Sequence, residues 1–152
     1  MTHVLKGMLA GLVATVVLSA LMLMKTMMGL MPELDLPRMI AGMMGAPDTP
    51  AIGWALHFMI GIVMYGAAIG LLGHRLPGSH TVQGMILGAI GWLIMMVMLM
   101  PMTGAGLFGM NMGVMAPMMT LVLHLVFGAV LGGVYGRAVR DQEAGGDTHA
   151  HA

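Results

Sequence analysis

The 152-residue sequence contains no cysteine, and only 8% of its residues are charged. The lack of cysteine excludes disulfide bonds, thiolate metal ligands and thiol redox chemistry. Because the formal net charge is zero, the charge balance gives no indication of a nucleic-acid partner. Asp, Glu, Lys and Arg are absent from residue 76 to residue 136. A stretch of this length without charge is not typical of a protein whose surface faces water.

Long apolar segments make up most of the sequence, in which 59% of the residues are hydrophobic. A helix needs about 20 apolar residues to cross roughly 30 Å of hydrocarbon, at a rise of about 1.5 Å per residue. Four segments reach this length, namely residues 4–28, 51–72, 81–100 and 117–136. A membrane β-barrel would show short alternating segments instead. The sequence therefore predicts an all-α integral membrane protein with four transmembrane helices in a lipid bilayer.

Two parts of the sequence repeat each other. The pattern Leu-His-x-x-x-Gly-x-Val-x-x-Gly occurs once around His57 and again around His124, and an upstream Gly-Met-x-x-Gly pattern is duplicated in the same way. Each copy contains two apolar segments, so the halves 4–72 and 81–136 would insert in the same orientation. We therefore predict a tandem parallel repeat of two helices, with both histidines at one depth near the outer face.

The distribution of cations predicts the orientation of the chain. Four cations lie on the side shared by both termini and the second loop, against two on the other side. Because cytoplasmic loops are enriched in Lys and Arg, we expect both termini to be cytoplasmic. Residues 1–140 are predicted to form the four-helix membrane domain, and residues 141–152 a disordered cytoplasmic tail.

Histidine and methionine supply the candidate ligands. His57 and His124 lie on helix faces where small residues recur every four positions, and such faces are expected to point into the bundle. Of the 23 methionines, 18 lie within residues 22–44 or 95–119, at the predicted depth of the histidines. Thioethers are soft ligands that suit Cu(I). The two residue types together indicate a metal or cofactor site on the repeat axis.

Several interpretations of the histidine pair remain open. In the first, the two histidines are the axial ligands of a haem b, and Gly61 and Gly128 leave room for the macrocycle. In the second, they bind Cu(I) together with the thioethers of Met96 and Met98. In the third, each histidine only forms hydrogen bonds across the bundle, to the hydroxyls of Ser19, Thr15 or Thr120, and the protein is a structural or accessory subunit of a larger membrane complex.

A transport path along the repeat axis is a further alternative. Four helices enclose only a narrow pore, so a transporter or channel would need a homo-oligomer. None of the four predicted spans contains an acidic residue, which disfavours a coupled transporter. The sequence also lacks a nucleophile and base pair, a phosphate-binding loop and paired carboxylates, so an enzyme is disfavoured.

Four motifs are spread along the chain before Arg140: Lys6-Gly7-x-x-Ala10-Gly11, Met31-Pro32-x-Leu34-Asp35, Met100-Pro101-Met102-x-Gly104-Ala105-Gly106 and Ala116-Pro117-x-Met119-Thr120-Leu121-x-Leu123-His124-Leu125. Through these motifs the sequence resembles a family of small uncharacterised four-span bacterial inner-membrane proteins. The resemblance implies four helices and a place in the bacterial inner (cytoplasmic) membrane. It implies no activity.

Overall fold

The computed structural model describes residues 2–149. Four of its helices are long and apolar enough to cross a membrane. These long helices are His3–Met27, Pro50–Arg75, His80–Met102 and Met115–Gln142. Each begins close to the start predicted from the sequence. The described part of the chain contains no strand, so the predicted all-α fold class is confirmed.

The second and third long helices each contain a segment that is not α-helical. The second consists of α3 (Pro50–Met59), the π-helical segment η1 (Ile60–Tyr65), α4 (Gly66–Leu72) and the 3-10 turn η2 (Gly73–Arg75). The third consists of α5 (His80–Ile94), the π-helical segment η3 (Met95–Leu99) and α6 (Met100–Met102). π-helical turns hold an extra residue and are often found at functional sites, so a functional site is expected near these two segments.

The first and fourth long helices are continuous α-helices. They are α1 (His3–Met27) and α7 (Met115–His149). The helix α7 runs on through residues 141–149, where the sequence predicts a disordered tail, and residues 150–152 lie outside the described residues. Once a helix is nucleated by packing, each further residue adds a hydrogen bond, so the helix extends into polar sequence.

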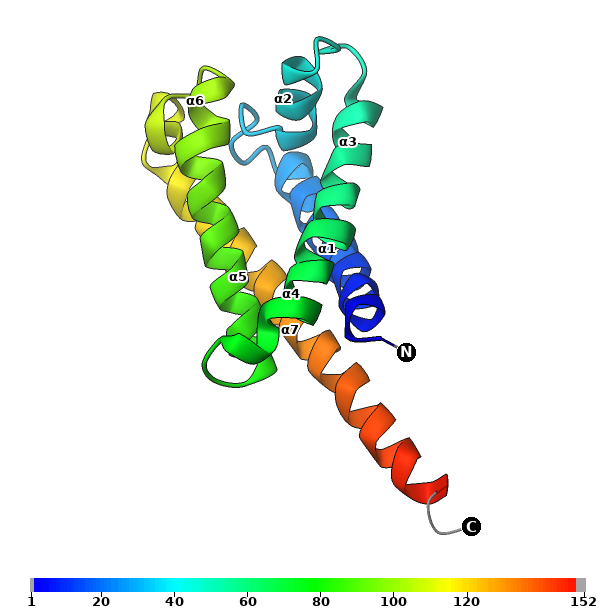
Figure 1. Ribbon diagram of the computed structural model, residues 1–152. Helices are drawn as coiled ribbons and strands as arrows, with labels where there is room; N and C mark the ends of the chain where they lie inside the picture. The colour runs from blue at the N-terminus through cyan, green and yellow to red at the C-terminus, as the bar shows by residue number, and fades with distance from the viewer. Residues whose placement is uncertain (1, 150–152) are drawn as a thin grey trace.

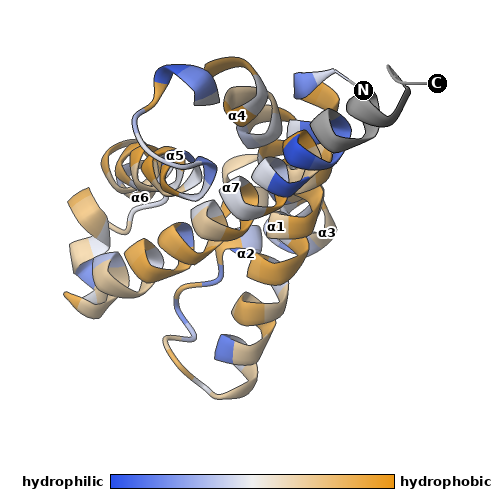
Figure 2. Ribbon diagram, turned by 90° about the horizontal axis from the view of Figure 1, so that it is seen from below, coloured by the Kyte–Doolittle hydropathy of each residue, from blue (hydrophilic) through white to orange (hydrophobic). Residues whose placement is uncertain are grey.

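The short helix α2 (Leu36–Met43) and α6 lie at one end of the molecule, which we call the α2–α6 end, and both described termini lie toward the other end (Figure 1). α1 packs against η1, α4 and α7, and α5 packs against α7. The second and third long helices meet through α4 and α5 and diverge toward the α2–α6 end (Figure 1). The long helices are coloured largely as hydrophobic along their lengths (Figure 2).

Glycines set the closest approach between α1 and the second long helix. Gly7 lies against the carbonyl of Gly66, and Gly11 lies against the carbonyl of Gly61. A Cβ atom at either position of α1 would overlap with the opposite carbonyl oxygen. Small residues therefore allow direct backbone packing here, as expected for helices in an apolar solvent.

The contact between α5 and α7 also depends on glycines that lie against backbone carbonyls of the opposite helix. Gly84 lies against the carbonyl of Gly128, and Gly88 lies against the carbonyl of His124. The closest approach of these two helices thus includes the backbone of a candidate site residue. Replacing any of these glycines by a larger residue would push the helices apart.

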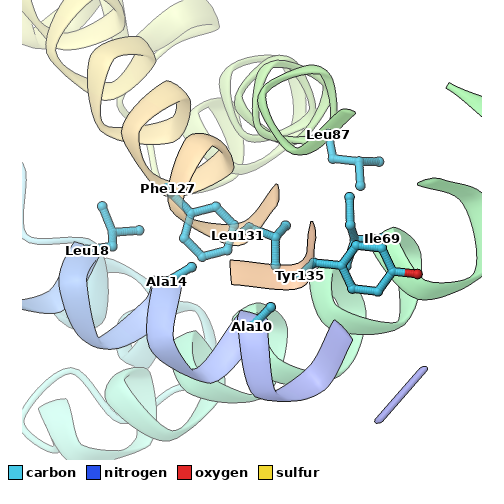
Figure 3. Packing of buried hydrophobic residues seen from close by; sticks show 8 residues of the cluster. All are labelled: Ala10, Ala14, Leu18, Ile69, Leu87, Phe127, Leu131 and Tyr135. Atoms are coloured by element: carbon cyan, nitrogen blue, oxygen red, sulfur yellow. The ribbon is translucent and has the colours of Figure 1, made fainter. Parts of the chain in front are cut away.

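A buried apolar cluster joins all four long helices on the side of the termini. It consists of Ala10, Ala14, Leu18, Ile69, Leu87, Phe127, Leu131 and Tyr135 (Figure 3). Tyr65 packs edge-on against Phe127, with ring centroids 4.8 Å apart. Ile69 and Leu131 have no exposed surface. The helices are therefore tightly closed at this level.

The loop between α1 and α2 is fastened by Lys25, at the end of α1. Its Nζ atom donates hydrogen bonds to the carbonyl oxygens of Met31, at 2.9 Å, and Leu34, at 2.8 Å. The next helix, α2, is capped by Asp35, whose carboxylate accepts a hydrogen bond from the Arg38 backbone N–H at 3.1 Å. These bonds hold α2 across the end of the bundle.

A second apolar cluster covers the α2–α6 end beside α2. It consists of Leu34, Met95, Met96, Met100 and Ala105. The 3-10 segment η4 (Leu107–Met112) completes it, because the Phe108 ring lies 5.9 Å from the ring of Trp92 on α5. The uncharged loop between α6 and α7, residues 103–114, thus folds back over the end of the third and fourth long helices.

Candidate functional site

A cavity of about 560 Å³ lies between the diverging second and third long helices, with α2 at one end. Its lining is apolar except for Thr15, His57, Tyr65 and His124, and no charged side chain among the described residues takes part in it. The volume lies within the range of small-molecule and cofactor sites. Both candidate histidines therefore open into the same uncharged cavity.

His57 is held in the last turn of α3, directly before the π-helical segment η1. Its side chain is only 8% exposed, and its Nε2 atom is buried with no hydrogen-bond partner among residues 2–149. The rings of Trp54 and Phe58 stand edge-on to the imidazole, at 5.8 and 5.9 Å. An unpaired buried nitrogen costs about 1–3 kcal/mol, and a ligand on this atom would remove that cost.

His124 is fixed by a hydrogen bond to its own helix. Its Nδ1 atom lies 2.8 Å from the carbonyl oxygen of Thr120. Since a carbonyl can only accept, Nδ1 bears the proton in this bond, and Nε2 of the neutral ring keeps its lone pair. Metal-bound histidines are commonly oriented in this way by a carbonyl on the second ring nitrogen.

Trp92 supports the residue that fixes His124. The indole Nε1 atom donates to the hydroxyl of Thr120, at 3.1 Å, and that hydroxyl lies 2.7 Å from the carbonyl oxygen of Ala116, to which it donates. The hydrogen bonds therefore run from α5 to the turn of α7 that carries the histidine. This support was not anticipated from the sequence, because it depends on which helices pack together.

Six thioethers line the same cavity, those of Met43, Met44, Met64, Met95, Met98 and Met102. The predicted ligand Met98 is among them, and so is Met95, which the sequence analysis did not select. The predicted ligand Met96 does not line the cavity. Its side chain is fully buried in the second apolar cluster, with its sulfur 3.9 Å from the Thr120 hydroxyl. Met95 and Met98 both belong to the π-helical segment η3, so the residue spacing of an α-helix does not predict that they line one cavity.

Gly61 and Gly128 both pack against neighbouring helices. A Cβ atom on Gly61 would overlap with the side chain of Thr15 on α1, and a Cβ atom on Gly128 would overlap with Gly84 on α5. Only Gly61 also lines the cavity. Each glycine therefore has a role in helix packing, and a haem contact of Gly61 and Gly128 stays a prediction.

The residues around the cavity do not fit a haem. Haem propionates are commonly met by cations, whereas the lining carries none among the described residues. Lys25, the cation at the end of α1, already donates hydrogen bonds to two backbone carbonyl oxygens. The cavity thus offers imidazoles and thioethers but no group to neutralise the propionates.

The hydroxyls that were expected to pair with the histidines are already satisfied within their own helices. Thr15 donates to the carbonyl oxygen of Gly11 and Ser19 donates to that of Thr15, each at 2.7 Å. The Thr120 hydroxyl also bonds within α7, and only its backbone carbonyl reaches a histidine. Within residues 2–149, hydrogen bonding across the bundle therefore leaves the Nε2 atom of His57 without a partner.

The described residues contain no group of three or more His, Cys, Asp or Glu side chains that could hold a metal ion. A metal ion in this cavity would therefore have to take thioether ligands beside the two imidazoles. Such a mixed set of neutral, soft donors favours Cu(I) over harder ions such as Mg²⁺ or Ca²⁺.

Comparison with known proteins gives a family but no activity. The model of a family of unknown function (DUF6789) matches residues 1–145. No curated protein matches the chain, and no solved structure matches it. The chemistry of the cavity is therefore the best guide to function.

Proposed function

Since the chain belongs to a family of unknown function, DUF6789, we propose its function from the cavity: it is a multi-pass membrane protein that binds one Cu(I) ion. The ligands are the Nε2 atoms of His57 and His124 and the thioethers of Met95 and Met98. The proposal rests on one observation, the buried and unpartnered Nε2 atom of His57 in a cavity that also receives His124.

The surface of the long helices supports a membrane location. Large apolar side chains such as Leu12, Met64, Ile94 and Val122 are exposed on the four helices. Extensive apolar surface is unfavourable in water and is the normal surface of a helix in lipid. The distribution of cations supports cytoplasmic termini and an outward-facing α2–α6 end, in a bacterial inner membrane. The duplicated sequence pattern supports a tandem repeat of two helices.

Charge and ligand type support Cu(I) as the ligand. Imidazole and thioether are neutral, so a bound ion keeps its charge in an apolar cavity, and burying a single charge costs less than burying two. Soft sulfur ligands also favour Cu(I) over Zn²⁺ and harder ions. The cavity is larger than an ion, and flexible methionine side chains are suited to closing around one.

The closed packing below the cavity supports binding on one side of the membrane rather than transport through the chain. Tyr65 and Phe127 are in contact at the cavity floor. Beneath them, Ile69 and Leu131 are fully buried. An ion in the cavity would meet these side chains before it reached the end with the termini. We therefore propose that the protein stores or delivers Cu(I) at its α2–α6 end, without catalysing a reaction.

The proposal is tested by anaerobic titration of the purified protein in detergent against a chromophoric Cu(I) chelator. We expect the wild-type protein to compete for one Cu(I) per chain and the double variant His57→Ala/His124→Ala to lose this binding. The variant His74→Ala is the matched control, because His74 is an exposed histidine outside the cavity. A wild-type protein without Cu(I) affinity, or a double variant that binds as well as the wild type, would contradict the proposal.

A further inference from the structure

The thioethers that line the cavity differ in their exposure to the surroundings. Met102 is 67% exposed and Met44 is 63% exposed, whereas Met95 is only 7% exposed and His57 only 8%. Met98 lies between Met95 and Met102 along the third long helix, and its side chain is 59% exposed. Soft ligands are therefore available from the surface of the molecule down to the histidines.

Met102, Met44 and Met64 are the most exposed of these thioethers, at 67%, 63% and 63%. Met44 and Met102 stand on opposite walls of the cavity, whereas Met64 lies on η1 in the middle of the second long helix. Met44 directly follows α2, which closes one side, and Met102 is the last residue of α6 on the other side. Both elements lie at the same end of the molecule (Figure 1). Met44 and Met102 thus flank the part of the cavity that lies at the α2–α6 end.

Among the other lining residues at this end, only Met43 of α2 carries a possible ligand within the described part of the chain, and it is less exposed than Met44, at 37%. Leu36, Ile40 and Leu99 line the cavity next to the two methionines and have only hydrocarbon side chains. A cation that gives up its water ligands here has to be met by other donors, because desolvating a charge without replacement is very costly. The two exposed thioethers are the donors placed to do this.

On the basis of the proposed Cu(I) site, we infer that Met44 and Met102 are its entrance ligands. They take the ion at the surface and pass it by ligand exchange to Met98 and then to the two histidines. Each step replaces one neutral donor by another, so copper stays in the Cu(I) state and no electron or proton is transferred. Since they do not hold the ion in its final position, they govern the rate of loading and not the equilibrium affinity.

The inference is tested by stopped-flow transfer of Cu(I) from a coloured small-molecule Cu(I) complex to the wild-type protein and to Met44→Leu/Met102→Leu. Leucine keeps the apolar volume and removes the sulfur. We expect the loading rate of this double variant to fall by about tenfold, a change within the range that association rates show among variants of one site. The Kd at equilibrium should equal that of the wild type.

The matched control is Met24→Leu/Met118→Leu. Both methionines are more than half exposed, at 54% and 57%, but they do not line the cavity, so this variant should load at the wild-type rate. An entrance variant that loads as fast as the wild type would overturn the inference, and so would one that loses affinity in proportion to its rate. The wild-type Kd from the same experiment tests the proposed site itself, so the failure of each idea is recognised separately.

Discussion

The pair formed by α1 and the second long helix shares a sequence pattern with the pair formed by the third long helix and α7. The two pairs hold their histidines differently. Between α5 and α7, the closest approach includes the carbonyl oxygen of His124, which lies against Gly88. Between α1 and the second long helix, the backbone contact nearest to His57 lies at Gly61, one helical turn beyond it, and the other contacts lie further along, at Gly66 and Gly70. At the level of His57, α3 packs mainly against α2 instead of α1. One histidine is therefore next to a tight helix contact, and the other lies where the helices diverge.

The residues around the two histidines explain the rest of the difference. Trp92 supports Thr120 and so the turn that fixes His124. The residue at the corresponding position of the first half is Thr15, which donates to its own helix and supports no histidine. The turn of α3 that carries His57 is also followed by the π-helical segment η1, whereas α7 continues as a regular α-helix after His124. A duplicated pattern thus yields one fixed imidazole and one with a free nitrogen.

The largest effect is expected from breaking the contact between α5 and α7. In Gly128→Ala the new Cβ atom would overlap with the backbone of Gly84, whereas in Gly133→Ala it has an ordinary contact with Thr81 at 3.9 Å. Overpacking of this kind costs about 1–3 kcal/mol, and a rigid backbone gives a value at the upper end. Thermal and chemical unfolding in detergent should show Gly128→Ala strongly destabilised and Gly133→Ala close to wild type. Equal stabilities for the two variants would mean that this helix contact is not as close as described.

Substituting the two histidines one at a time separates binding from stability. His57→Ala and His124→Ala should each weaken Cu(I) binding by at least about tenfold, equivalent to ~1.4 kcal/mol. Only His124→Ala also removes a hydrogen bond, which contributes about 1 kcal/mol to folding. Competition titrations and unfolding curves on the same preparations measure both quantities. If His57→Ala were the less stable variant, the assignment of the free and the fixed imidazole would be reversed.

The methionines of η3 distinguish the face that lines the cavity from the face that packs against Thr120. Met95→Leu/Met98→Leu should weaken Cu(I) binding, because it removes both proposed sulfur ligands. Met96→Leu is the matched control from the same segment and should bind as the wild type does. Leucine and methionine have similar volumes, so each substitution should cost less than about 1.5 kcal/mol of stability. A loss of Cu(I) affinity in Met96→Leu alone would favour the ligand set first predicted from the sequence.

The four long helices were predictable because their signal is local and strong. Each requires an uninterrupted apolar segment of sufficient length, and the charged and proline-rich loops delimit these segments. The choice of His57 and His124 was also within reach, since ionisable groups in apolar helices rarely face lipid. The structure places both histidines at one cavity. The metal that they bind remains a prediction.

The details of the site could not be predicted, because they depend on packing between helices. No residue in Ile60–Tyr65 or Met95–Leu99 signals a π-helical turn. The direction of a side chain follows from the backbone around it, so the sequence did not show that Met96 packs in the second apolar cluster and not at the cavity. The sequence also does not say whether Gly61 and Gly128 face a ligand or another helix, because a glycine allows either to approach.

The smallest effect is expected from Trp92→Phe. Phenylalanine keeps an aromatic ring against Phe108 and removes the indole N–H that bonds to Thr120 and to the carbonyl oxygen of Pro117. The loss should lower the free energy of unfolding by about 1 kcal/mol. Because it acts on His124 only through Thr120, Cu(I) affinity should change less than in His124→Ala. Parallel unfolding and titration experiments would show whether this support is as modest as the geometry indicates.

The most direct test of the account is X-ray absorption spectroscopy at the copper edge of the Cu(I)-loaded protein, compared with His57→Ala and His124→Ala. The account predicts a wild-type ligand shell with nitrogen scattering from two imidazoles together with sulfur. Each variant should lose one imidazole from that shell. A shell of sulfur alone, unchanged in both variants, would show that copper binds to the methionine-rich loops and not between the two histidines.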